Sequence, residues 1–309
     1  MGLQVLALAC LVGAIILGFV RKMNVGIVCF GLALILGTIG GMASGKIYGG
    51  FPYKLFSTLL GTMLFFSLLQ QNGTLEKVSK KLISFCGNNT FLVPVIIYLV
   101  SFILSAAGPG AISVQSVTVM FAVQMDASPV LMGAMAILGA VGGTASPIAL
   151  TGIIVNDLLA QMNMEGVGMN MFIGVSIANF ACAVVTYIVL GGYKLRRSAG
   201  EAAAVKEHFT KEQTISLVAL LIMVVMVVGF SYDVGLICFT LSLVLILLRT
   251  ADEKKAIKMI PWNVLILIAG VSVLMNITQT MGGIELLSNI LASFMNSVTA
   301  APLMGFTGG

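Results

Sequence analysis

The chain has 309 residues, of which 59% are hydrophobic and only 9% are charged, and its mean hydropathy is +1.10. Soluble domains carry about 25% charged residues, so this composition excludes an ordinary soluble protein and predicts an all-α polytopic membrane protein. The net charge of +5 does not indicate nucleic-acid binding, because the basic residues fall in short loops between apolar runs, where they set topology.

Apolar runs of the length that crosses a bilayer recur along the chain. The predicted spans are Leu3–Val20, Asn24–Gly41, Leu55–Gln71, Met169–Tyr193, Thr214–Phe230, Val234–Leu248 and Trp262–Met281. Two further apolar segments, Phe91–Met125 and Pro129–Leu159, are each interrupted near the middle by glycine, proline and hydroxyl residues. An amphipathic stretch at 74–85 and a second one after Met281 are expected to lie at the membrane surface.

The chain contains an internal repeat at a shift of 209 residues. NVGIVCFGLALIL at 24–36 falls on DVGLICFTLSLVL at 233–245, with seven of thirteen positions identical. At the same shift, residues 70–85 fall on 279–294 with seven of sixteen identical, and Gly61 falls on Gly270. One ungapped offset that serves two distant windows indicates a duplication.

The positive-inside rule predicts the orientation. With the N-terminus outside and 91–125 as a hairpin that enters and leaves on one side, all basic residues except Lys46 and Lys54 lie inside, fourteen of sixteen. A single crossing at 91–125 would place the basic loop 194–213 outside. Two full crossings would need a longer segment than the about 35 residues of 91–125.

Each repeat then has five transmembrane helices plus one re-entrant hairpin, and the odd number of crossings inverts the second copy. The predicted organisation is a first repeat over 1–193, with a hairpin at about 91–125 and a broken helix at about 129–159. A cytoplasmic linker follows at 194–213, and 214–309 forms a truncated second repeat, because a full copy would extend to roughly residue 402. Inverted repeats with broken helices are typical of secondary transporters.

The two interruptions are the predicted transport site, because irregular backbone at membrane depth is tolerated only where it is buried in protein or lines a wet cavity. Freed carbonyls and hydroxyls suit a hard cation, and helix N-termini suit a carboxylate. The predicted substrate-binding residues are Ser105, Gly108, Pro109, Gly110, Ser113, Thr144, Ala145, Ser146 and Pro147. The predicted cation-binding residues are Ser105, Gly110, Gly142, Gly143 and Thr144.

Ionisable residues are missing from the predicted spans, and Asp126 and Asp157 lie only at segment ends. A proton relay normally needs such residues within the membrane, so their absence favours cation-coupled anion symport. The sequence carries no HExxH or GxSxG motif and no metal-ligand spacing. We therefore expect no enzyme, no catalytic residue, no metal site and no cofactor other than a coupling ion, Na⁺ or H⁺.

Five stretches of the chain resemble a known family: MGLQVLAL, GGFPYKLF (49–56), the NGT after the third span, SAAGPGAIS and GGTASPIALTGIIVN. They resemble the malonate/dicarboxylate carrier family of the ion transporter superfamily, which includes the divalent anion:sodium symporters. The resemblance implies inverted repeats, substrate and cation sites at hairpin tips and unwound helices, and elevator-like transport by homodimers. Sodium-coupled relatives carry Ser-Asn-Thr at each hairpin tip, where this chain has Gly108-Pro109-Gly110.

These observations predict a secondary active transporter of small dicarboxylates such as malonate, succinate or malate in the inner (plasma) membrane. The alternatives are a Na⁺/H⁺ antiporter or an arsenite-type anion exporter of the same fold, or a non-functional fragment. An acidic residue at mid-membrane would favour the antiporter or the exporter. The expected partners are the carboxylate substrate, the lipid bilayer and a second copy of the chain, and no nucleic acid.

Overall fold

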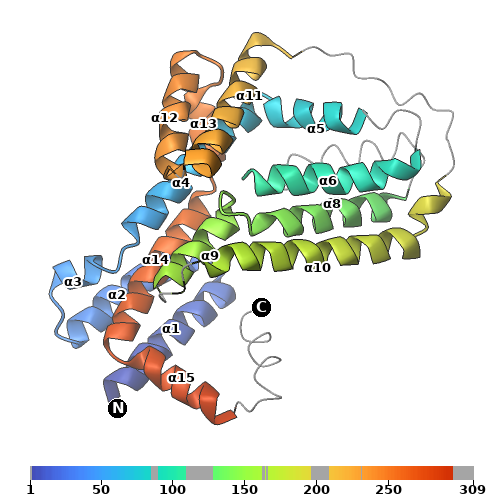
Figure 1. Ribbon diagram of the computed structural model, residues 1–309. Coiled ribbons are helices and arrows are strands. Elements are labelled where there is room, and N and C mark those ends of the chain that lie inside the picture. The colour runs from blue at the N-terminus through green and yellow to red at the C-terminus, as the bar shows by residue number, and fades with distance from the viewer. Residues whose placement is uncertain are drawn as a thin grey trace. The chain divides into compact units, whose positions relative to one another are not determined.

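The computed structural model describes residues 2–84, 90–108, 128–161, 164, 166–195, 209–230 and 232–294. Over these ranges the chain is helical and contains no strand (Figure 1). The chain divides into two compact units, one formed by 1–56 with 261–309 and the other by 57–260.

All the α-helices except α3 and α13 fall in apolar or amphipathic segments expected from the sequence, and α1, α10 and α14 are long and apolar enough to cross a membrane. The first unit holds α1 (Gly2–Arg21), α2 (Val25–Ile39), α3 (Ser44–Tyr48), α14 (Trp262–Thr280) and α15 (Gly283–Phe294). The second holds α5 (Thr74–Ser84), α6 (Val93–Ala106), α8 (Pro129–Thr144), α9 (Leu150–Gln161), α10 (Val167–Val189), α11 (Lys211–Val224), α12 (Val234–Leu247), α13 (Glu253–Met259) and most of α4 (Tyr53–Gln71).

Short elements accompany these helices. Turns of 3-10 helix lie at η1 (Thr90–Leu92) and η2 (Gly192–Lys194), and α11 continues as a π-helical turn, η3 (Val225–Gly229). The helices α3 and α13 fall in segments that the sequence analysis left as loops. Both are shorter than eight residues, too short for a hydrophobic period to reveal them.

In the first unit, α2 and α14 cross with their backbones in direct contact. A Cβ built on Gly26 would overlap the carbonyl oxygen of Ile266 and lie 2.6 Å from the Cα of Leu267. A Cβ on Gly270 would overlap the carbonyl oxygen of Gly26. Because lipid gives helices no hydrophobic reason to associate, such close approach of small residues supplies the van der Waals contact that holds them together.

The start of α2 is fixed by one side chain. Asn24 accepts a hydrogen bond from the Gly26 amide at 2.8 Å, which caps the helix, and its own Nδ2 donates to the carbonyl oxygen of Asn263 at 2.7 Å. The same side chain therefore caps the start of α2 and ties it to the beginning of α14.

In the second unit, α6, α8 and α10 lie alongside one another (Figure 1). Gly139 approaches Tyr98 and Ser101, and Gly143, one turn later, approaches Phe102 and Ser105, so α6 and α8 run in the same direction. The α10 helix runs the opposite way, because its Phe172 stacks on Phe102 and its Phe180 meets Tyr98.

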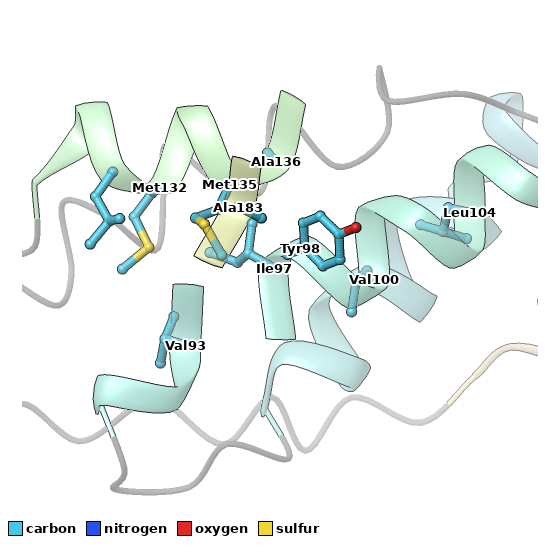
Figure 2. Close-up of a cluster of buried hydrophobic side chains, with 10 residues drawn as sticks. Val93, Ile97, Tyr98, Val100, Leu104, Met132, Met135, Ala136 and Ala183 are labelled. Atoms are coloured by element: carbon cyan, nitrogen blue, oxygen red, sulfur yellow. The ribbon is translucent and has the colours of Figure 1, made fainter. Parts of the chain in front are cut away.

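The core of this bundle is a cluster of apolar side chains from α6, α8 and α10. Figure 2 shows Ile97 and Tyr98 of α6 beside Met135 of α8 and Ala183 of α10. At one end, the Tyr187 hydroxyl of α10 donates to the carbonyl oxygen of Phe91 at 3.0 Å, which links the end of α10 to the beginning of the α6 segment.

A polar hub at Asn72 joins the ends of several helices in the second unit. The side-chain Nδ2 of Asn72 donates to the Ser216 hydroxyl at 2.7 Å, and its Oδ1 accepts from the backbone N–H of Thr74 at 3.1 Å. Gln213 Nε2 donates to the Asn72 carbonyl at 3.2 Å, while Gln213 also completes a capping box with Thr210 at the start of α11. The hub thus fixes α4, α5 and α11 at one end.

Replacing Gly26 with leucine should destabilise the protein, because the side chain would enter space filled by the Ile266 and Leu267 backbone. Overpacking of this kind costs about 1–3 kcal/mol or more, and we expect a lower melting temperature for the detergent-solubilised protein. Gly31→Leu on the same helix is the matched control, since a Cβ there meets nothing within 4 Å. Equal melting temperatures for the two variants would contradict the close crossing.

Candidate transport site

The helix that begins at Pro129 stops at Thr144, and helical backbone resumes only at Leu150. Ser146-Pro147 explains the stop, because proline has no N–H to donate and disfavours helical backbone in the residue before it. The chain instead turns tightly: the Ser146 amide donates to the Gly143 carbonyl at 3.1 Å, and the Ala149 amide to the Ser146 carbonyl at 2.9 Å. Ser146, Ile148 and Ala149 of the interruption are buried, so the polar groups freed there need partners.

Three carbonyls at the end of α8 find donors. The Thr144 hydroxyl donates to the Val141 carbonyl at 2.8 Å, and the Ser146 backbone amide donates to the Gly143 carbonyl. The Gly142 carbonyl accepts from the hydroxyl of Ser176 on α10, at 3.1 Å. A carbonyl oxygen has two lone pairs. The Gly143 carbonyl uses both, because it also accepts from the Ala145 amide, whereas the Gly142 carbonyl can still accept a second hydrogen bond or ligate a cation.

On the far side of the turn, α9 packs back against the interruption. A Cβ on Gly152 would overlap the Ser146 carbonyl oxygen and lie 2.8 Å from the carbonyl oxygen of Ala145. Only a glycine allows this approach, since the obstacle is backbone rather than a flexible side chain. Gly152 therefore fixes how α9 leaves the turn.

The end of α6 meets the end of α8. A Cβ on Gly143 would overlap the Phe102 carbonyl oxygen and lie 2.7 Å from the Ala106 amide and 3.0 Å from the Cβ of Ser105. Ser105 is only 1% exposed, and its Oγ has no hydrogen-bond partner within the described residues. An unpaired buried hydroxyl costs about 1–3 kcal/mol, so Ser105 is a group for which a ligand or water would supply the missing partner.

The chain leaves α6 through Gly108, whose φ of +124° is a conformation that favours glycine. The Gly108 amide donates to the Ser105 carbonyl at 3.2 Å, and a Cβ at this position would overlap the ring of Phe66 on α4. Gly108 is thus held between its own helix and an aromatic side chain.

The structure brings part of the predicted site together. Ser105 of α6 lies against Gly143, next to Gly142 and Thr144, and the predicted residues Ala145, Ser146 and Pro147 form the turn that follows. Ser146 is buried, while Thr144, Ala145 and Pro147 are partly exposed. The predicted residues that lie outside the described part of the chain are Pro109, Gly110 and Ser113, together with Asp126 at the end of the predicted hairpin.

Sequence reasoning missed the contribution of α10. Ser176 holds the Gly142 carbonyl, and Asn179 lies with its Cβ 3.3 Å from where a Cβ on Gly142 would be. Single polar residues in an apolar run form no motif, so only their proximity to the interruption reveals them. Ser176 also lines an aromatic groove of about 270 Å³ between α6 and α10, with Tyr98, Phe102 and Phe180.

The chemistry of this region is that of neutral oxygen and N–H groups. Among the described residues there is no group of three or more His, Cys, Asp or Glu side chains that could hold a metal ion. The described ends of α6 and α8 offer carbonyls, hydroxyls and amides, which are the ligands that alkali cations and carboxylates accept.

Comparison with known protein families settles the class. A model of the family described as citrate transporter, CitMHS, matches residues 9–308. The chain belongs to this family. No curated protein sequence matches the chain. The match agrees with the expectation of a transporter rather than an enzyme. It identifies the citrate transporter family and not the narrower malonate/dicarboxylate carrier family that the sequence resembles.

Gly143→Ala should disturb the contact between the two helix ends. Alanine is the better helix former, so at an open position it would add up to about 1 kcal/mol of stability. At Gly143 the methyl group meets the Phe102 and Ala106 backbone, and we expect a net loss of about 1–3 kcal/mol. Melting of the purified protein tests this, with Gly133→Ala on the same helix as control, because a Cβ there is in open space. A stabilised Gly143→Ala protein would refute the contact.

Proposed function

We propose that this member of the citrate transporter family is a secondary active transporter that couples a cation to the movement of small di- or tricarboxylates, citrate and malonate-like acids among them. The observation that carries the proposal is the interrupted helix α8–α9, whose end packs on Ser105, a buried residue whose hydroxyl has no partner among the described residues. A membrane protein bears the cost of such a break where it lines a binding site.

The proposed coupling follows from charge. A di- or tricarboxylate brings two or three negative charges, and the described α6, α8 and α10 helices hold no Lys or Arg that could neutralise them. Hydroxyls and amides alone compensate poorly for the cost of dehydrating such an anion. A cation held by the carbonyl of Gly142 and the hydroxyls of Ser105 and Thr144 would supply the missing charge, so substrate and cation would bind together.

The re-entrant hairpin is part of the proposal, and the directions of the helices support it. Because α6 and α8 run in the same direction, a single crossing by the segment that precedes Pro129 does not fit. A helix that enters the membrane and turns back at Gly108 fits these directions.

The inverted repeat is also part of the proposal, and two glycine crossings support it. In the first unit, Gly26 of α2 meets Leu267 and Gly270 of α14. In the second unit, Gly235 of α12 meets Thr58 and Gly61 of α4, with the Cβ of Gly235 placed 2.5 Å from the Cα of Thr58. Adding 209 to Gly26 and subtracting it from Leu267 and Gly270 converts the first set of residues into the second.

By the repeat, α2 corresponds to α12, and α4 corresponds to α14. The crossings pair α2 with α14 and α12 with α4, so each helix packs on a helix from the other copy of the repeat. Asn24 and Asp233, also 209 apart, each cap the helix that makes the crossing.

With an odd number of crossings per repeat, the proposed protein has its N-terminus outside and the 194–213 loop inside the cytoplasm. A multi-pass protein of the plasma membrane that works as a homodimer, with elevator-like movement, completes the proposal.

The function is tested by uptake of radiolabelled citrate, malonate and succinate into proteoliposomes, with inward Na⁺ or H⁺ gradients. We expect uptake of at least one acid to require one of the two gradients. Ser105→Ala should reduce it by about tenfold or more, the effect of one lost hydrogen bond to a charged ligand. Ser242→Ala, another buried serine without a partner among the described residues, is the matched control and should transport normally. Uptake equal to that of empty vesicles under every gradient would overturn the proposal.

The inverted topology is tested with single cysteines at Met23 and Tyr232 in a protein without native cysteines. These residues are 209 apart and similarly accessible, 50% and 55% exposed. A membrane-impermeant maleimide should label Tyr232→Cys in intact cells, and Met23→Cys only after the membrane is permeabilised. Labelling of both from the same side would rule out an inverted repeat.

A further inference from the structure

Ser176 makes a hydrogen bond that is unusual for a hydroxyl on a membrane helix. Thr38, Thr240 and Thr280 each donate to the carbonyl four residues earlier in their own helix, at 2.7–2.9 Å. Ser176 instead donates across to the Gly142 carbonyl of α8, at 3.1 Å. Three residues further along α10, Asn179 donates back to Val175 at 2.9 Å, so the inter-helix bond belongs to Ser176 and not to every polar group on this face.

The recipient of this bond is a carbonyl that the interruption leaves without its helical donor. In an unbroken helix the Ser146 amide would bond to Gly142, four residues earlier. In this protein it bonds to Gly143. The Phe102 ring, which lies 3.2 Å from where a Cβ on Gly142 would be, offers no donor. Ser176 therefore replaces the amide that the turn removes.

We propose that Ser176 is a positioning residue: its hydroxyl holds the Gly142 carbonyl, and with it the interrupted end of α8, in the geometry that binds the coupling cation. This inference rests on the proposed transport function. Ser176 uses one lone pair of the carbonyl and leaves the other for a ligand. The bond also ties the turn to α10, so the cation site keeps its shape only while α8 and α10 stay together.

The proposal predicts a specific kinetic defect. Without the hydroxyl, the Gly142 carbonyl is free to turn away, and the cation loses a pre-oriented ligand. The cation concentration for half-maximal uptake should rise about tenfold in Ser176→Ala, the effect of a lost hydrogen bond of about 1.4 kcal/mol. Maximal uptake at saturating cation should stay near the wild-type value. Ser176→Thr keeps the hydroxyl and should restore the wild-type cation dependence.

Two measurements on the full-length purified protein test this. The first is uptake of the transported acid at varied Na⁺ or H⁺ concentration for wild type, Ser176→Ala, Ser176→Thr and the control Thr240→Val, whose hydroxyl bonds only within its own helix. The second is hydrogen–deuterium exchange of residues 144–150 without substrate. Faster exchange in Ser176→Ala, reversed in Ser176→Thr and absent in Thr240→Val, is the expected result.

The two measurements separate the two proposals. If the wild-type protein transports no carboxylate, the proposed function fails, while the exchange experiment still reports whether Ser176 holds the turn. Unchanged exchange at 144–150 in Ser176→Ala would overturn the positioning role. The role would also be overturned if Ser176→Ala and Ser176→Thr lost cation affinity equally, because packing and not the hydroxyl would then be responsible.

Discussion

Every backbone polar group in this protein must find a partner inside the protein, because lipid offers none. Continuous helices meet this condition within themselves. The interruption between Thr144 and Leu150 does not, and the surrounding structure is built to compensate for it. Thr144 and Ser146 bond back to the end of α8, and Ser176 reaches across from α10. The antiparallel course of α10 places the Ser176 hydroxyl where the freed Gly142 carbonyl is.

Close backbone contact is the second condition that shapes the fold. Where hydrophobic burial does not drive association, helices are held together by van der Waals contact between closely packed backbones. Such close packing requires small residues, glycine above all, at the crossing. Gly139 and Gly143 let α8 lie on the α6 backbone, and Gly26 with Gly270 do the same for α2 and α14. The glycines at the end of α8 bear on both conditions, since Gly143 allows the close packing and Gly142 has the carbonyl that the proposed cation site uses.

Ser105 is tightly packed, yet its hydroxyl is available to a ligand. Ser105 is enclosed by the contact between α6 and α8, yet its hydroxyl has no partner in the described part of the chain. In the same unit, Ser101 and Ser242 are also buried without a partner among the described residues, but Ser105 is the one whose Cβ lies beside Gly143 at the end of α8. A buried hydroxyl that stays unpaired beside an interrupted helix is consistent with a site whose ligand completes it.

Most of the local structure was determined by the sequence alone. The apolar runs predicted α1, α2, α4, α10, α12 and α14 to within a few residues, because hydropathy and helix length depend only on neighbours in the chain. Ser146-Pro147 also located the interruption, since proline acts on the residues next to it. The helices α3 and α13 escaped because they are too short to show a period.

Only the tertiary structure decided which groups meet. That Ser176 donates to Gly142, that Gly143 lies on Ser105, and that α6 runs parallel to α8 are contacts between residues far apart in the chain. A glycine that makes such a contact looks in the sequence like Gly31 or Gly133, which touch nothing. The difference lies in which helices pack together, and that choice depends on the summed fit of whole helix surfaces, which no short stretch of sequence contains.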